Sequence, residues 1–161
     1  MDIRNWPMDR IMQLPDCCFG RRWPIVFSDA VPAPGGAFYF ISEIALPEKC
    51  ILWELEATTR PLVVEGTVAW FFALKLGDKQ PASDAEFTAM EDMLPGCDAI
   101  DFSNRVIHNN LSLRRLRMPI ISSGRRVVLR VDVSDYTSAL WAVGLVFSSF
   151  PTEVPDCLLS V

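Results

Sequence analysis

Residues 125–150 read RRVVLRVDVSDYTSALWAVGLVFSSF, and this stretch decides the fold class. Apolar side chains alternate with other residues through both of its halves, at Val127, Leu129, Val131 and Val133 and again at Ala139, Trp141, Val143, Leu145 and Phe147. Such alternation is typical of β-strands, because successive side chains point to opposite faces of a sheet. The largely polar residues 134–138 separate the two halves. The stretch therefore predicts two antiparallel strands joined as a hairpin.

Shorter stretches of similar character precede this one. Strands are predicted, in chain order, at residues 24–28, 37–46, 50–59, 62–65 and 67–76. In residues 50–59 one face holds Ile51, Trp53, Leu55 and Ala57, and the other face holds Glu54 and Glu56. Residues 67–76 are apolar on both faces, which predicts a central strand covered on both sides. Residues 104–118 fit either one bent strand or two short ones.

The spacing of apolar residues changes over residues 83–94. Ser83 and Glu86 form a capping box, and Phe87, Met90 and Leu94 follow at helical intervals. Gly96 stands where a glycine often closes a helix. We therefore predict one amphipathic helix of about three turns, inserted between strands or covering an open end of the sandwich.

About seven or eight short strands with one helix indicate an all-β protein. We expect mainly an antiparallel β-sandwich, jelly-roll or immunoglobulin-like, with one inserted amphipathic helix. A chain of 161 residues is most simply one domain. We divide it into an N-terminal arm (1–24), the β-sandwich (25–150) and a proline-containing C-terminal tail (151–161).

The composition indicates a folded chain without a membrane anchor. Half of the residues are apolar and 22% are charged, which excludes wholesale disorder. No apolar run approaches the roughly 20 residues of a membrane helix, and Asp2, Arg4, Asp9 and Arg10 are foreign to a signal peptide. We therefore expect synthesis in the cytoplasm without a signal peptide. The five cysteines have no CxxC spacing and are interpreted as reduced thiols.

Patterns for catalysis and metal binding are weak. His108 is the single histidine, and Cys97 or Cys17 could pair with it as a nucleophile, with Asp98 or Asp101 orienting the ring. No local signature accompanies these residues, and an ordinary strand or loop histidine is the simpler interpretation. The cysteines and this histidine also lack the spacing of a zinc site. We expect no enzyme activity, no metal and no cofactor.

A carbohydrate site is a second possibility. Glu43, Glu54 and Glu56 could supply a carboxylate pair for glycoside cleavage, although carboxylates on the outer face of a strand are usually only solvated. Tryptophans stack on sugars, but three of the five fall on the apolar phase of their strands and fit core packing: Trp53, Trp70 and Trp141.

Charge is distributed unevenly along this chain of net charge −5. Residues 1–103 hold 8 basic and 16 acidic side chains, whereas residues 104–161 hold 7 basic and 4 acidic ones. Five arginines surround one turn: Arg114, Arg115, Arg117, Arg125 and Arg126. The acidic total argues against a dedicated nucleic-acid binder. We interpret the arginines as a basic patch for an acidic protein surface, such as the first half of another copy, with a solvated loop cluster as the alternative.

The first 24 residues are rich in tryptophan, methionine and proline. Pro7 suits the first turn of a short helix with a stripe of Met8, Ile11 and Met12, and Pro15 limits its length. One or two turns are not stable alone, so this segment must pack on its own sandwich or on a neighbouring subunit. We favour a neighbour, contacted by the apolar side chains of the arm: Trp6, Met8, Ile11, Met12, Phe19 and Trp23.

Together these features predict a non-enzymatic structural protein of a multi-subunit assembly. Its partners would be other copies of itself and other proteins of the assembly, bound through the arm and the arginine cluster. By analogy between folds, we expect a phage or virus particle component with a capsid-decorating, collar or fibre-anchoring role, incorporated into a virion. The alternatives are a carbohydrate-binding β-sandwich and a small Cys/His enzyme. No membrane, nucleic-acid or small-molecule partner is expected.

Overall fold

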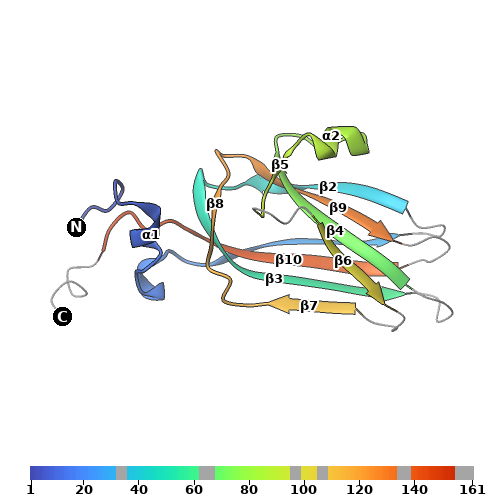
Figure 1. Cartoon of the computed structure of the whole chain (residues 1–161), viewed down its shortest axis with the longest axis horizontal. Helices are drawn as coiled ribbons and strands as arrows, with labels where there is room; N and C mark the ends of the chain where they lie inside the picture. The colour runs from blue at the N-terminus through green and yellow to red at the C-terminus, as the bar shows by residue number, and fades with distance from the viewer. Residues whose placement is uncertain (32–35, 62–67, 95–98, 105–108, 134–138, 155–161) are drawn as a thin grey trace.

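The computed structural model describes residues 1–31, 36–61, 68–94, 99–104, 109–133 and 139–154, which form two antiparallel sheets packed face to face (Figure 1). The first sheet contains β1 (Trp23–Val31), β10 (Ala139–Ser149), β3 (Lys49–Pro61), β7 (Asn109–Leu113) and β8 (Met118–Ile121). The second sheet contains β2 (Gly36–Ala45), β9 (Arg126–Val133), β4 (Val68–Gly77), β5 (Glu91–Asp92) and β6 (Ala99–Asn104). The helices of the described chain are short: α1 (Met8–Ile11), the 3-10 helix η1 (Asp16–Cys18) and α2 (Asp84–Thr88).

Strand pairing is nested along the chain. The first strand, β1, pairs with the last, β10, while β2 pairs with β9, β3 with β7 and β8, and β4 with β6, all antiparallel. A chain folded back on itself in this way, with its strands divided between two facing sheets, is a jelly roll. The predicted all-β, mainly antiparallel sandwich is therefore confirmed, and the pairing selects the jelly-roll alternative.

The last two long strands lie in different sheets, so the predicted hairpin over residues 125–150 is wrong. β9 lies between β2 and β4, whereas β10 lies between β1 and β3. The two strands face each other across the core and share no ladder of hydrogen bonds. The alternation correctly predicted which face of each strand is buried. It does not distinguish two strands paired in one sheet from two strands that pack against each other in facing sheets.

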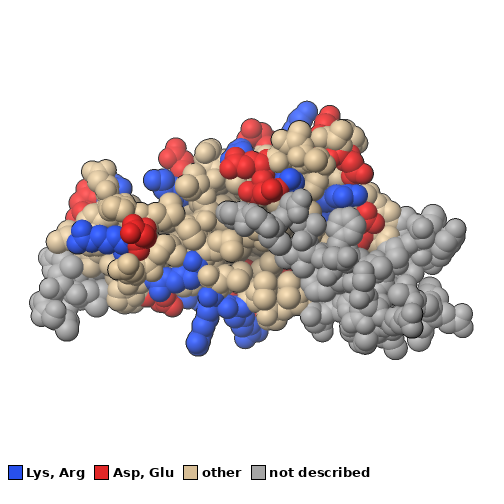
Figure 2. All heavy atoms as spheres, in the orientation of Figure 1, with Lys and Arg blue, Asp and Glu red and all other residues tan. Residues whose placement is uncertain are grey.

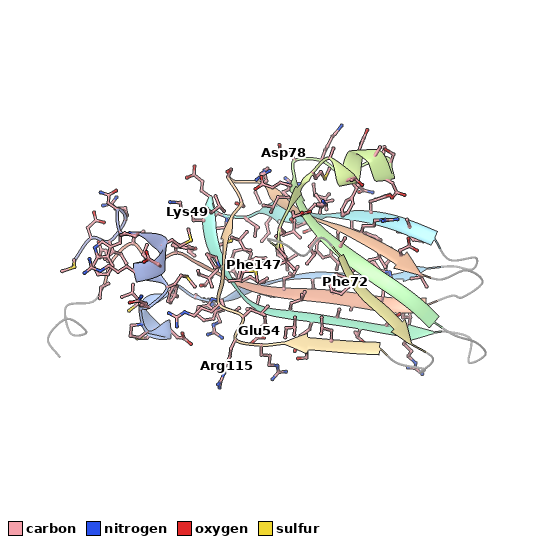
Figure 3. The ribbon with its side chains drawn as sticks, in the orientation of Figure 1. Lys49, Glu54, Phe72, Asp78, Arg115 and Phe147 are labelled. Carbon is pink, nitrogen blue, oxygen red and sulfur yellow. The ribbon has the colours of Figure 1, made fainter. Side chains whose placement is uncertain are left out.

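The space between the sheets holds the core. The alternating side chains of β9 and β10 are each at most 3% exposed: Val127, Leu129, Val131, Val133, Trp141, Val143, Leu145 and Phe147. Figure 3 shows Phe147 of one sheet and Phe72 of the other within this space, and both are completely buried. The buried faces predicted for these strands are confirmed. The side chain of Trp70, also predicted in the core, lies outside the described residues.

A β-bulge divides the face predicted for residues 50–59. The register between β3 and β10 shifts at Trp53, which has no partner residue in β10. Leu55 and Ala57 belong to the main core, whereas Ile51 and Trp53 belong to a second cluster on the outer side of the sheet. A bulge reverses the alternation of side chains beyond it. The four side chains predicted on one face are therefore divided between the two faces of the sheet.

The helix predicted over residues 83–94 is shorter than expected. Ser83 caps it, its Oγ accepting the backbone N–H of Glu86 at 3.3 Å, but α2 has only five residues. The chain then forms β5, which pairs with the end of β4, and Met93 and Leu94 enter the main core. Pairing with β4 thus replaces the expected further turns of helix. Gly96, the predicted C-cap, lies outside the described residues.

The sequence pattern did not predict two of the strands. β6 was not predicted, and β8 begins only at the end of the ambiguous stretch 104–118. That stretch holds β7, in agreement with its interpretation as short strands, and the predicted edge segment 62–65 lies outside the described residues. Within the described chain, no helix is long and apolar enough to cross a membrane.

The beginning of the chain pairs with the start of the predicted tail. The Ile3 N–H donates to the Thr152 carbonyl at 3.0 Å, and the Val154 N–H donates to the Met1 carbonyl at 3.1 Å. Ile3 and Val154 are buried. Residues 1–3 and 151–154 thus form one unit, which lies with α1 at one end of the sandwich (Figure 1).

Candidate interaction surfaces

Part of the outer face of the second sheet is covered by α2 (Figure 1). Phe87 of this helix packs against Ala73 of β4 and Val128 of β9, and all three side chains are buried. The Phe87 ring centroid lies 5.7 Å from that of Tyr39 on β2. From Phe72 to Leu76, where its side chains are described, β4 is therefore covered on both sides, as predicted from residues 67–76.

Polar contacts fix α2 and β5 to this sheet. The Tyr39 hydroxyl donates to the Asp84 carboxylate, and the Arg130 Nε lies 3.2 Å from the same group. Lys75, only 7% exposed, forms an ion pair with Asp92. Burial is the main cause that raises the pKa of Tyr39 to about 12, and the hydrogen bond to the Asp84 carboxylate is the next largest. The chain itself thus occupies the part of this outer face around Ala73, Lys75 and Val128.

The N-terminal segment covers one end of the outer face of the first sheet. Ile11 and Phe19 are buried and pack on Ile51 and Trp53 of β3. The Phe19 and Trp53 rings meet edge to face, with centroids 5.4 Å apart. The Trp53 Nε1 donates a 2.7 Å hydrogen bond to the Ser148 Oγ of β10. This segment is therefore packed as part of its own domain.

The expectation that the N-terminal segment keeps its apolar side chains for another chain is therefore wrong for Ile11 and Phe19. The bulge at Trp53 turns large apolar side chains outward, and these two residues cover them. The rest of the predicted set is partly exposed: Trp6, Met8, Met12 and Trp23. Trp23 belongs to β1, and its ring stacks on that of Phe147 at 5.2 Å.

Arginine side chains hold the N-terminal segment against the sheet. The Asp16 carboxylate lies 3.1 Å from Arg117 and 3.7 Å from Arg22. The Arg117 guanidinium also donates to the Leu14 carbonyl, and the Arg22 guanidinium lies 4.2 Å from the Trp53 ring centroid. Exposed ion pairs and cation–π contacts contribute little individually, so this network orients the segment while the apolar cluster holds it.

The five clustered arginines do not form one basic patch. Three are paired within the chain: Arg114 with Glu56 (3.2 Å), Arg117 with Asp16 (3.1 Å) and Arg125 with Glu91 (2.6 Å). Arg115 and Arg126 make no ion pair with another described residue, and Arg115 points away from the molecule (Figure 3). Figure 2 shows basic side chains at the lower margin and mixed charges elsewhere on the visible face. Contact of the five arginines with an acidic partner surface stays a prediction.

The rest of the outer face of the first sheet is here called the open face. The strand register places these outward residues on it: Val26, Ser28, Leu140, Ala142, Gly144, Glu56, Thr58 and Ser112. Val26 is 66% exposed and Leu140 is 45% exposed. A groove of about 580 Å³ lies between the Val26 side chain and the Glu56–Arg114 pair, over small residues such as Ala142 and Gly144. The described chain places no helix over this groove.

Gly144 forms part of the floor of the groove. A Cβ atom added to Gly144 would meet no other atom within 4 Å, and its φ is not in the left-handed region. The fold of the chain itself therefore does not require glycine here. Glycine inside a strand lowers stability and often marks the close approach of a ligand or of another backbone.

A second concavity lies between the N-terminal segment and the β2–β3 turn. This cleft, of about 430 Å³, is lined in part by Trp6 and Phe150. One face of the Trp6 ring is covered by the Arg10 guanidinium, 3.8 Å from the ring centroid. Glu54 and Glu56 do not line this cleft, so the structure does not bring the exposed tryptophan and the glutamate face together.

The residues considered for nucleophilic chemistry lie largely outside the described residues: Cys97, Asp98, the side chain of Asp101, and His108. Cys17 is exposed on η1, and Glu43 is exposed on β2. Cys50 is buried, and burial raises the pKa of its thiol to about 12, so the thiol stays protonated at neutral pH. Among the described residues, no group of three or more His, Cys, Asp or Glu side chains is placed to hold a metal ion.

Comparison with known proteins identifies no family. No family model matches the chain, and no curated protein does. Among solved structures, it resembles a protein of infectious bursal disease virus, Gx strain, at TM-score 0.43 and 12% identity, over 84% of this chain and 34% of that one. It resembles the cyanophage Pam1 capsid at TM-score 0.42 and 16% identity, over 81% and 86% of the two chains. It resembles a chain of turnip yellow mosaic virus at TM-score 0.38 and 10% identity, over 84% of each.

The chain thus spans about a third of the length of the bursal disease virus protein. All three TM-scores are below 0.5. The strand pairing therefore establishes the fold, and these similarities support no conclusion about function.

Proposed function

We propose that the protein is a non-enzymatic structural component of a multi-subunit assembly, of the kind that builds phage and virus particles. Its neighbours, other copies and other proteins of the assembly, would bind through the open face. In this proposal the open face replaces the N-terminal segment as the main contact surface, because the segment is committed to its own domain.

The observation that supports the proposal is the unequal covering of the two sheets. The second sheet has α2 and its ion pairs on its outer face, whereas the open face carries exposed Val26 and Leu140 beside a groove. Exposed apolar side chains around a groove are typical of surfaces that bind another molecule. A jelly roll by itself hosts many functions, so the fold class does not contribute to this choice.

The proposal is tested by the mass of the full chain in solution. Sedimentation velocity from micromolar to millimolar concentration should show association of the wild type. Val26→Glu, which adds a charge to the open face, should abolish it. Ile121→Glu is the matched control, because Ile121 on β8 is a similarly exposed apolar residue (54%) that does not line the groove beside Val26. A wild type that stays monomeric, or equal losses in both variants, would contradict the proposal.

A carbohydrate-binding role is the second candidate, favoured by the two aromatic rings, Trp6 and Phe150, that line the cleft of about 430 Å³. A glycan array separates it from the first. Binding that is lost in Trp6→Ala and retained in Trp23→Ala would support it, because Trp23 stacks on Phe147 and does not line the cleft. An array without binding would leave the structural role as the better account.

A further inference from the structure

We propose that the partner on the open face is a second copy of this chain, seated face to face, with Val26 of each copy inserted above Gly144 of the other. This inference rests on the proposed function and specifies the contact. It starts from the side-by-side position of a protruding side chain and an unfilled space. Val26 is the direct register partner of Gly144 in the β1–β10 pair.

A two-fold axis makes such a surface complementary to itself. Strands β1 and β10 are neighbours, about 4.8 Å apart. An axis that runs parallel to them, midway between them and above the sheet, places each Val26 over the partner's Gly144, so both contacts form together. This is an isologous interface, in which the same patch is used on both copies. No atom of the described chain lies within 4 Å of a Cβ added at Gly144, which leaves room for the tip of the inserted side chain.

The charged residues of the open face do not prevent the open face of a second copy from approaching. The chain carries a net charge of −5, but the outward charged residues of this face and its rim are balanced: Glu54, Glu56, Arg60 and Arg114. Glu56 and Arg114 are already paired within the chain. Two open faces therefore meet without an excess of like charge, which would otherwise oppose association.

The size of the face predicts a weak contact. The axis between β1 and β10 lays only these two strands of each copy over the partner. Two strands about 4.8 Å apart, each contributing about seven residues at about 3.3 Å, span roughly 200 Å². Stable pairs usually bury about 800 Å² per partner. The pair should therefore dissociate at low concentration and form readily where many copies are held together, as they are in an assembly.

The first test fills the space above Gly144. Gly144→Leu should leave the monomer folded and weaken self-association by about tenfold or more, because the added side chain occupies the place of the partner's Val26. Gly20→Leu is the matched control, since Gly20 is exposed and an added Cβ has no neighbour nearer than 3.9 Å. Circular dichroism and thermal unfolding check the fold of both. Unchanged association of folded Gly144→Leu would overturn the inference.

The second test locates the contact directly. Chains carrying Val26→Cys are mixed with chains carrying Gly144→Cys, oxidised, and digested, and the linked peptides are identified by mass. A disulfide between residues 26 and 144 of different chains is expected. Links only between two copies of residue 26 would leave the open face as an interface but overturn this packing. A wild type that remains monomeric would instead contradict the proposed function, as would a monomer that binds an oligosaccharide on this face.

Discussion

The Nε1 of Trp53 donates a hydrogen bond of 2.7 Å to the Oγ of Ser148, which lies 95 residues further along the chain. Trp53 is the bulged residue of β3, and Ser148 lies on β10. Both side chains are buried beneath the N-terminal segment. The bond therefore joins the two central strands of the first sheet at the point where the segment covers them.

Removing this acceptor should lower stability. Ser148→Ala leaves the buried Trp53 Nε1 without a partner, which costs about 1–3 kcal/mol in the free energy of unfolding. Urea unfolding followed by tryptophan fluorescence measures the change. Ser149→Ala is the control, because Ser149 is the exposed neighbour on the same strand. Equal free energies for the two variants would show that the bond contributes nothing.

The N-terminal segment should behave as part of the domain core. Phe19→Ala removes an aromatic ring that packs on Trp53, and we expect the free energy of unfolding to fall by about 3 kcal/mol. Asp16→Ala breaks exposed ion pairs to Arg117 and Arg22, and we expect a fall of about 1 kcal/mol at most. Guanidinium unfolding compares the two. A larger effect of the aspartate substitution would mean that charge, and not the apolar cluster, holds the segment.

The sequence allowed the buried face of most strands to be predicted, but not their partners. Val131 and Val143 alternate correctly and are buried, yet they lie on facing sheets and not on one hairpin. Alternation of apolar and polar residues indicates only that one face of a strand is buried. Which strand lies beside it depends on contacts between distant segments, and the nested pairing of β1 with β10 left no local signal.

Two features of the surfaces do have a signal in the sequence. Cys50-Ile51-Leu52-Trp53 is an unbroken apolar run, which indicates burial on both faces and hence a cover over the outer one. In β10 the outward positions Leu140, Ala142, Gly144 and Val146 are all uncharged, unlike those of a strand face that is simply solvated. For the arginines the sequence predicted a basic patch where the structure has ion pairs. Their nearness in the sequence did not show that three of them pair within the chain.

The titration of Tyr39 should be displaced to high pH. Its pKa is raised from 10 to about 12, so the folded protein holds this proton over a range in which the unfolded chain has lost it. The free energy of unfolding should therefore fall as pH rises from 10 to about 12. The buried Cys50 thiol, with its pKa also raised to about 12, acts in the same direction from pH 9.

The measurement is a spectrophotometric titration of the ionised phenol in wild type and Tyr39→Phe. The chain has two tyrosines, so Tyr136→Phe assigns the other one. The high-pH step should disappear only in Tyr39→Phe, and this variant should also lose less stability between pH 10 and 12. Ionisation of Tyr39 near pH 10 in the folded protein would show that the hydroxyl is neither buried nor held against Asp84.

Two glycines should respond oppositely to a single added methyl group. A Cβ at Gly77 would lie 3.1 Å from the Met90 sulfur and 3.2 Å from a methyl carbon of the buried, β-branched Val128, so Gly77→Ala forces neighbours apart where α2 packs on the sheet. Because Met90 is flexible but Val128 is not, we expect a loss of about 1 kcal/mol. At Gly144 the same atom meets nothing within 4 Å, and Gly144→Ala should be neutral or stabilising by up to about 1 kcal/mol. Chemical unfolding at low protein concentration, where the chain is monomeric, measures both. Destabilisation by Gly144→Ala would mean that the monomer itself needs this glycine, which would remove the reason for assigning it to an interface.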